Sequence, residues 1–356
     1  MHEIWNFSAG PAKLPRPVLE KAQEELLSYK DTGISVMEMS HRSEAFKDIL
    51  EETETRLRNL LNISEDYEVL FLQGGASLQF LMVPMNLKQK GKAAYIHTGN
   101  WSKKGMTEAK KAGFEVDVIG SSEDKNFSYI PKWETDFTPY DYVHITTNNT
   151  ISGTAYTEFP DTDDVPLVAD MSSNILSKPL DVSKFDLIYA GAQKNAGIAG
   201  VTLVIVRKEL VNRVEDLPTL LDYEVHAKRN SAFNTPPTFA IYMSNLIFEW
   251  LEDLGGLEER GRRNNAKAEK LYAYLDQTDF YQTPVTGKDR SIMNIPFVTG
   301  DEELDQEFIA YAEAQGIQNI KGHRSIGGMR ASIYNAMPME GVDALIHTLK
   351  TFEQER

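Results

Sequence analysis

Short apolar runs alternate with amphipathic stretches along the chain up to about residue 250. Brief apolar runs bounded by polar or small residues are typical of buried strands. Between several of them lie helical patterns such as Trp101–Ala112, whose lysines form a polar face. The expected strands are Val69–Leu72, Ala93–His97, Val116–Ile119, Tyr142–Thr146, Leu167–Asp170, Leu187–Ala190 and Thr202–Val206. This alternation predicts an α/β domain with a largely parallel sheet that helices cover on both faces.

The pattern changes near Pro236, where longer amphipathic helices begin. We expect helices over Thr238–Leu254 and Glu258–Leu275, with Gly255 and Gly256 as the break between them. The remainder predicts strand, helix, strand and helix over Ile292–Phe297, Glu302–Ala314, Met329–Tyr334 and Val342–Phe352. That order suits a small α+β domain of roughly 90 residues.

Composition narrows the chemistry that this chain can carry out. Its net charge of -16, from 37 basic and 53 acidic side chains, disfavours nucleic acid and anionic membranes as partners. The absence of cysteine removes disulfides, thiolate metal sites and cysteine nucleophiles, and we expect no metal. The sequence does not begin like a secretory signal peptide, and it has no apolar stretch long enough to cross a bilayer. We therefore expect a soluble cytoplasmic protein. Small anionic substrates remain compatible with this charge if arginines gather locally.

Two strand ends carry residues that suit a bulky ligand bound at the edge of the sheet. Lys194 lies in the small-residue segment Tyr189–Gly197, directly after an apolar strand, where bulky groups can approach it. A turn with a solvated lysine is the commoner explanation for a lone lysine. Asp170 ends the strand Leu167–Asp170, at the edge where open α/β sheets bind ligands. In a pyridoxal enzyme such an aspartate pairs with the pyridinium nitrogen, although a helix cap is the commoner role for an isolated aspartate.

The segment Phe71–Leu78 suits a single phosphate. It runs from a strand through Gly74 and Gly75 into a helix that begins near Ala76, so backbone N–H groups and the Ser77 hydroxyl face an anion. No GxxxxGK[ST] sequence occurs, and no GxGxxG follows a strand, which disfavours a nucleotide.

Further residues suit a planar ring and anionic substrates. Trp101 follows a strand, where its side chain can stack on a planar ring; packing as an ordinary residue at the start of a helix is the alternative. Thr150 follows another strand. Basic residues cluster at Ser40–Arg42 and Gly322–Arg330, where arginine forks can bind carboxylates or phosphates. Exposed loop arginines are the alternative interpretation for either cluster.

Taken together, these segments resemble the phosphoserine aminotransferase family, in the class V group of fold-type I pyridoxal-phosphate enzymes. The resemblance covers essentially the whole chain. Its most specific parts are Asn6–Ala12, similar to the family's opening, and Gly322–Arg324 with Gly327–Ala336, similar to its closing motif. The resemblance implies a large cofactor-binding domain over residues 16–260, a small domain from residues 1–15 and 261–356, and a homodimer with shared active sites.

The resemblance also implies a role for each candidate residue. Lys194 would form the internal Schiff base with pyridoxal 5'-phosphate, Asp170 would pair with the pyridinium, and Trp101 would stack on the ring. Thr150 would contact the ring's hydroxyl side. The cofactor phosphate would be held by Ala76, Ser77 and Gln193, and by Asn234 and Thr235 of the neighbouring subunit. Arg330 would take the substrate's α-carboxylate, and a second anion would be bound by His41, Arg42, His323 and Arg324.

By this resemblance, the enzyme transfers the amino group of L-glutamate to 3-phosphohydroxypyruvate, giving O-phospho-L-serine and 2-oxoglutarate in serine biosynthesis. The family also suggests 4-phosphohydroxythreonine as a second substrate. One alternative is another class V aminotransferase acting on alanine or serine and glyoxylate, but so small a substrate does not need paired His–Arg clusters. A non-catalytic pyridoxal-phosphate carrier is the other alternative. Cysteine desulfurase is excluded because no cysteine can carry the sulfur.

Overall fold

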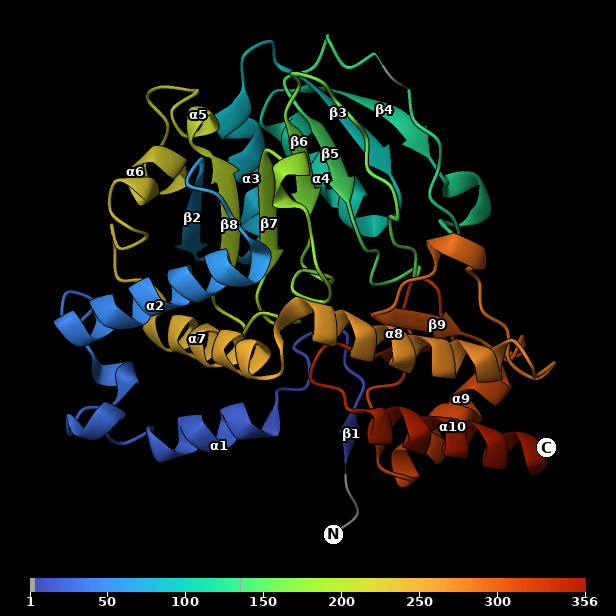
Figure 1. The fold of residues 1–356 in the computed structure, drawn as a ribbon. Coiled ribbons are helices and arrows are strands. Elements are labelled where there is room, and N and C mark those ends of the chain that lie inside the picture. Colours follow the sequence, from blue (N-terminus) through green and yellow to red (C-terminus); the bar gives the residue numbers. More distant parts are fainter. Residues whose placement is uncertain (1–3, 135) are drawn as a thin grey trace.

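A mixed sheet forms the centre of the computed structural model, which describes residues 4–134 and 136–356 (Figure 1). Its seven strands stand in the order β2–β8–β7–β6–β5–β3–β4. Their bounds are β2 (Tyr67–Leu72), β3 (Lys92–His97), β4 (Glu115–Ser121), β5 (Val143–Thr146), β6 (Leu167–Asp170), β7 (Leu187–Gly191) and β8 (Thr202–Arg207). Within this sheet β8 runs opposite to the other six strands, which are parallel to one another. The α/β class with a mostly parallel sheet is confirmed, and the expected strands lie within two residues of the observed ones.

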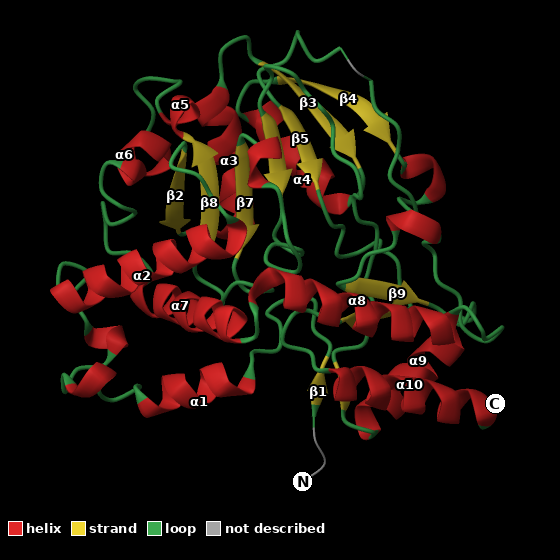
Figure 2. Ribbon diagram, in the orientation of Figure 1, coloured by secondary structure: helices red, strands yellow, loops and turns green. Residues whose placement is uncertain are grey.

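Helices cover the sheet on both faces (Figure 2). Successive side chains of a strand point to opposite faces of the sheet. The side chains of Tyr142 and His144 therefore point to one face, here called the first, and those of Val143 and Ile145 point to the second. The first face packs on α3 (Gly75–Leu87) and α4 (Asn100–Lys111) through residues such as Phe80, Met106, Tyr95 and Tyr189. The second packs on α2 (Glu44–Leu61) and α7 (Thr238–Asp253) through residues such as Phe46, Ile49, Ile241 and Leu246. Smaller helices flank these layers: α1 (Arg16–Glu24), α5 (Lys208–Val211) and α6 (Tyr223–Ala227).

The carboxyl-terminal part builds a separate apolar core. Here α8 (Gly256–Leu275), α9 (Glu302–Ala314) and α10 (Met339–Gln354) surround β9 (Asn294–Phe297), which pairs antiparallel with β11 (Met329–Ser332). The amino terminus joins this core, because β1 (Trp5–Asn6) pairs with β10 (Ile317–Gln318) and Trp5 packs among its apolar residues. The domain bounds 16–260 and 1–15 with 261–356 stay a prediction, and residues 1–3 lie outside the described residues.

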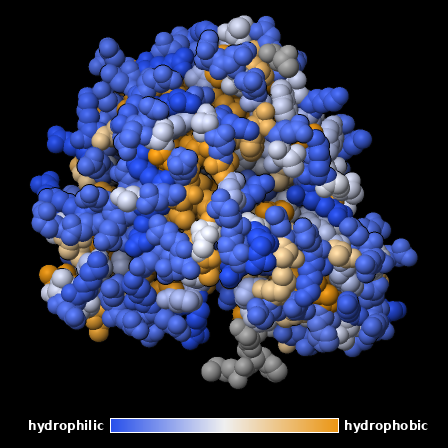
Figure 3. Space-filling view, in the orientation of Figure 1, coloured by the Kyte–Doolittle hydropathy of each residue, from blue (hydrophilic) through white to orange (hydrophobic). Residues whose placement is uncertain are grey.

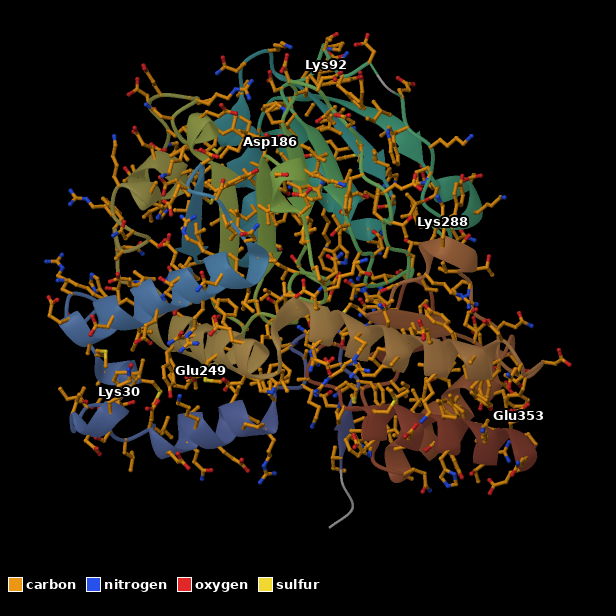
Figure 4. The ribbon with its side chains drawn as sticks, viewed as in Figure 1. Lys30, Lys92, Asp186, Glu249, Lys288 and Glu353 are labelled. Atoms are coloured by element: carbon orange, nitrogen blue, oxygen red, sulfur yellow. The ribbon has the colours of Figure 1, made fainter. Side chains whose placement is uncertain are left out.

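Charged side chains lie mainly at the periphery of the molecule. In Figure 4, Lys92 and Lys288 point outward, and their Nζ atoms lie 3.0 Å from Asp117 and 3.3 Å from Glu158. Such exposed ion pairs contribute about 0–1 kcal/mol each. The apolar cores therefore hold the fold, and these pairs add little. None of the helices in the described parts of the chain combines the length and apolar character that a bilayer crossing needs.

Candidate active site

A cavity of about 360 Å³ opens at the carboxyl ends of β5, β6 and β7. These parallel strands end side by side, so the loops that follow them meet at one edge of the sheet. Nine residues singled out in the sequence line this cavity: Ala76, Ser77, Trp101, Thr150, Asp170, Gln193, Lys194, His323 and Arg330. Loops far apart in the sequence thus bring an amine, a carboxylate, an aromatic ring and a guanidinium to one place.

Lys194 projects from the turn after β7 into this cavity. Its Nζ donates a hydrogen bond to Thr150 Oγ1 at 2.9 Å and lies 5.8 Å from the centroid of the Trp101 ring. Loss of solvent lowers the pKa of Lys194 to about 8; Asp170 opposes this shift and Arg330 adds to it. Such an amine is partly neutral near physiological pH, as a nucleophile and proton carrier must be.

Gly10 leaves room for the lysine side chain. Its φ of +137° is one that residues with a Cβ rarely adopt, and a Cβ there would lie 3.4 Å from Lys194 Cγ. The amino-terminal segment therefore forms one wall of the cavity against the lysine stem.

Asp170 is the last residue of β6 and is 5% exposed. Its Oδ1 accepts a hydrogen bond from the Ser172 backbone N–H at 2.9 Å. Burial raises the pKa of Asp170, and the hydrogen bonds from Ser172 oppose that shift. A buried carboxylate is stabilised by a cationic partner, so its presence in the cavity fits a protonated ring nitrogen.

The turn between β2 and α3 places helix N–H groups at the cavity. Gly74 and Gly75 have φ of +89° and +66°, and a Cβ on Gly74 would lie 2.5 Å from Leu78 Cδ2. Only glycine therefore fits position 74 without a shift of its neighbours. The first turn of α3, with Ala76 and Ser77, then presents unpaired backbone N–H groups that suit a phosphate.

Arg330 and His323 form the basic side of the cavity. Arg330 Nη1 donates to the Thr150 carbonyl at 3.2 Å, while its buried Nε has no hydrogen-bond partner among the described residues. His323 Nδ1 lies 2.7 Å from Ser325 Oγ. Burial, followed by the charges of nearby arginines and a lysine, lowers the pKa of His323. A guanidinium with an unused N–H is suited to a carboxylate.

Five of the singled-out residues do not line the cavity. His41 and Arg42 lie in the turn before α2, and Arg324 is exposed. Within the described residues, neither Arg42 nor Arg324 forms an ion pair. Asn234 lines a smaller cavity of about 100 Å³, and the Thr235 carbonyl accepts a hydrogen bond from Gln73 Nε2 at 3.2 Å. In this structure none of these five residues lines the cavity of its own chain.

The cavity also contains residues that sequence reasoning missed. They are Ala9, Gly10, Thr146, Asn148, Ile151, Ser172 and Ser173, while Gly75 belongs to the expected phosphate turn. Thr146 could have been found because, like Asp170, it is the last residue of a parallel strand, and its position is paired with Asp170. The buried Thr146 Oγ1 has no partner among the described residues.

These features together fit pyridoxal phosphate. The amine of Lys194, the carboxylate of Asp170 and the ring of Trp101 suit its aldehyde, ring nitrogen and flat face, and the start of α3 suits its phosphate. Within the described residues, Trp101 Nε1, Thr146 Oγ1 and Arg330 Nε are buried polar atoms without partners. Orphaned polar atoms at a cavity indicate that ligand groups complete their hydrogen bonds.

Known proteins resemble the chain over its full length. The model of the class V aminotransferase family matches residues 4–345. A phosphoserine aminotransferase of Listeria monocytogenes serotype 4b is 58% identical over 357 residues, covering 100% of this chain and 98% of that protein. One of Bacillus cereus (strain ATCC 14579) is 54% identical over 359 residues, covering 100% and 99%.

Solved structures agree with these relatives. The phosphoserine aminotransferase of Bacillus circulans subsp. alkalophilus superposes with a TM-score of 0.96 at 47% identity, covering 99% of each chain. The pyridoxal-phosphate-bound phosphoserine aminotransferase of Trichomonas vaginalis superposes with a TM-score of 0.93 at 39% identity, covering 98% of this chain and 100% of that one.

Proposed function

Since the chain belongs to the class V aminotransferases, and among these to the phosphoserine aminotransferases, we propose that the cavity around Lys194 is its catalytic site. The enzyme is a pyridoxal-phosphate-dependent transaminase. It passes the amino group of L-glutamate to 3-phosphohydroxypyruvate, giving 2-oxoglutarate and O-phospho-L-serine for serine biosynthesis. The observation that carries the site assignment is the meeting of the Lys194 amine, the buried Asp170 carboxylate and the incompletely bonded Arg330 guanidinium in one cavity.

Each residue of the cavity has a distinct task in this proposal. When bound, pyridoxal phosphate supplies an electron-withdrawing ring that stabilises negative charge on the substrate's Cα. Lys194 would hold the cofactor through its Nζ, and the same amine, when free, would take the proton from the substrate's Cα. Asp170 keeps the ring nitrogen protonated, and Trp101 packs on the ring face. Thr150 orients the Lys194 amine and the ring's hydroxyl side.

The remaining residues bind anions. Ala76, Ser77 and Gln193 hold the cofactor phosphate, and the first two lie at the positive end of the α3 dipole. Arg330 binds the α-carboxylate of the substrate through its free Nε. His323 and Arg324, with His41 and Arg42, bind the second anion, which is a carboxylate in glutamate and a phosphate in phosphoserine. Local cations are needed here because the molecule as a whole carries a charge of -16.

A homodimer with shared sites accounts for four of the five residues that lie outside the cavity. Large apolar side chains remain exposed along the amino-terminal segment, at Leu19, Leu26, Leu27, Ile34 and Met37. Figure 3 shows scattered hydrophobic residues near α1 and the turns that follow it, besides a larger hydrophobic stretch over the centre of the same face. An exposed apolar segment of this kind suits a subunit interface. His41 and Arg42 directly follow it and would enter the partner's cavity, with Asn234 and Thr235 at the partner's cofactor phosphate. A cytoplasmic location stays a prediction.

The glutamate half-reaction tests this assignment. Protein loaded with pyridoxal phosphate and given L-glutamate alone should release one 2-oxoglutarate per subunit, and later addition of 3-phosphohydroxypyruvate should give an equal amount of phosphoserine. A non-catalytic carrier would release nothing. Preference for alanine as donor with glyoxylate as acceptor would favour the other class V activity.

Covalent attachment gives a readout that does not depend on turnover. After borohydride reduction, the wild-type protein should gain the mass of the reduced cofactor, while a folded Lys194→Ala variant should not. Lys104→Ala is the matched control, because Lys104 Nζ also lies near the Trp101 ring, at 4.5 Å from its centroid. That variant should keep the adduct. An adduct retained by Lys194→Ala would contradict the role of Lys194.

A further inference from the structure

Asn335 lies five residues past Arg330, is 3% exposed, and has partners for its backbone and side-chain polar groups. Its backbone N–H donates to Asn195 Oδ1 at 3.0 Å, and its backbone carbonyl accepts from Arg260 Nη1. Its Nδ2 donates to the Leu176 carbonyl at 2.9 Å, and its Oδ1 accepts from Asn264 Nδ2 at 2.8 Å. One residue thus joins three separate segments of the chain.

These partners connect the two sides of the active site. Asn195 directly follows Lys194, and Leu176 lies in the turns after β6, the strand that ends at Asp170. The Asn195 side chain also donates to the Ile175 carbonyl at 3.1 Å, so both asparagines hold the same turn. Asn335 itself continues the chain from β11, which carries Arg330. The contact therefore lies between the lysine segment and the arginine strand.

A further residue of the helix α8, which also carries Arg260 and Asn264, holds the same segment. Lys267 on α8 is 2% exposed, and its Nζ donates to the carbonyls of Ile333, Tyr334 and Met337 at 3.0, 2.9 and 2.8 Å. A shift of the segment would leave several buried polar groups without partners, which is costly. Residues 333–337 thus have little freedom to move relative to Lys194.

Transamination depends on this spacing. The carboxylate of a substrate bound at Arg330 sets where its Cα lies, and that Cα must come within reach of Lys194 Nζ. A displacement of about 1 Å at a reacting centre can reduce the rate by roughly 100-fold.

We propose that Asn335 is a positioning residue that sets the distance between the carboxylate-binding Arg330 and the cofactor lysine Lys194. The proposal rests on the catalytic roles assigned to those two residues above. Asn335 touches neither substrate nor cofactor and acts through Asn195, Leu176 and the β11 segment.

The test compares variants that remove its contacts from different sides. Asn335→Ala removes the bonds to Leu176 and Asn264, and Asn195→Ala removes the acceptor for the Asn335 N–H. Each variant should have a higher KM for glutamate and a lower single-turnover rate in the glutamate half-reaction. The two effects together should lower kcat/KM by roughly tenfold to 100-fold. Pyridoxal phosphate should still attach to Lys194, as shown by the mass of the borohydride-reduced protein. In the double variant the losses should be less than multiplicative, because both residues act on one contact.

Asn86→Ala is the matched control for a purely structural role. Asn86 is 1% exposed, donates to the carbonyls of Met82 and Leu221 at 2.8 and 2.7 Å, and accepts from the Tyr223 N–H at 3.0 Å. Its loss should lower the thermal midpoint and leave KM and single-turnover rate near wild type. If Asn335→Ala behaves in the same way, the proposal is wrong.

A second variant covers the case in which Asn335→Ala does not fold. Asn264→Ala removes one partner of Asn335 from the α8 side and should raise the KM for glutamate about two- to threefold. A folded Asn264→Ala with unchanged KM and rate would overturn the proposal. A wild-type protein that released no 2-oxoglutarate would instead contradict the assigned function, so the two failures are distinguishable.

Discussion

Lys194 and Asp170 are both shifted toward their neutral forms by burial. The pKa of the lysine is lowered and that of the aspartate is raised. In the proposed site each shift would have a use, since a neutral amine can attack the cofactor's aldehyde, and a desolvated carboxylate binds a protonated ring nitrogen strongly.

The lowered pKa of Lys194 predicts the pH dependence of cofactor uptake. With a pKa of about 8, roughly a tenth of the amine is neutral at pH 7, against less than about 0.1% for an ordinary lysine. The attachment rate of pyridoxal phosphate to the cofactor-free protein should therefore rise about tenfold per pH unit below pH 7 and level off above pH 8. Stopped-flow absorbance measures it, with Nα-acetyl-lysine as the unshifted reference. A rate that kept rising to pH 10 would show an unperturbed amine.

Asp170→Ala should separate attachment from proton removal. Lys194 remains, so the borohydride-reduced adduct should form, although pyridoxal phosphate should bind less tightly. Proton removal from glutamate should slow by several orders of magnitude because the ring loses its protonating partner. Exchange of the Cα hydrogen with deuterated solvent measures that step directly. Exchange at near wild-type rate would remove Asp170 from this role.

Position at the end of a strand set some single residues apart. Lys194 and Asp170 follow or end apolar strands, so the sequence alone indicated that they reach the ligand-binding edge. Ser172 and Asn148 are short polar residues in the segments after strands, with no local pattern that separates them from ordinary loop residues. Asn335 could not be found, because its partners come from positions 176, 195, 260 and 264 and meet only in the folded chain.

Among the elements, periodicity located strands well but not their direction. The apolar run of β8 looks like that of β6, yet β8 is antiparallel to both its neighbours. Direction depends on the connections at each end of a strand, which apolar patterns do not encode. The start of one helix also differs from the expected one. The helix α8 begins at Gly256 instead of Glu258, because Gly255, with a φ of +95°, already forms its N-cap.

The turn before α3 gives a prediction at this scale. In Gly74→Ala the new Cβ would meet Leu78 Cδ2 at 2.5 Å, at a φ that alanine adopts with strain. We expect a loss of about 1–3 kcal/mol in the free energy of unfolding and weaker pyridoxal phosphate binding, since the α3 N–H groups would shift. Gly256→Ala is the matched control, because its φ is +74° and its Cβ would meet nothing within 4 Å. It should cost about 1 kcal/mol without changing cofactor affinity. Unchanged affinity in Gly74→Ala, measured by fluorescence titration, would argue against a phosphate site at this turn.

At the scale of the whole molecule, the proposed site needs residues from two chains. Two of the four basic residues assigned to the second anion, His41 and Arg42, follow an exposed apolar segment and do not line their own chain's cavity. A homodimer in which this segment packs on a partner would bring them to the partner's Arg330 and Lys194.

Subunit mixing tests this arrangement. Arg42→Ala and Lys194→Ala dimers should each be nearly inactive, because every site lacks one required group. When the two are unfolded and reassembled together, about half of the dimers should be mixed. In a mixed dimer, one site combines the intact Lys194 of one chain with the intact Arg42 of the other, and the second site carries both defects. With one good site in two, the mixture should regain roughly a quarter of wild-type activity.

A second pair of variants supplies the control, because Arg330 and Lys194 line the same cavity of one chain. When Arg330→Ala and Lys194→Ala subunits are mixed, each site of the mixed dimer still lacks one of the two groups, so no activity should return. Subunit exchange is verified in both mixtures by native mass spectrometry of chains with different tags. If the Arg42 mixture also stayed inactive despite verified exchange, Arg42 would act in its own chain's site or outside the site altogether. If the Arg330 mixture recovered activity, Arg330 and Lys194 would belong to different sites, and the cavity described here would not be the catalytic unit.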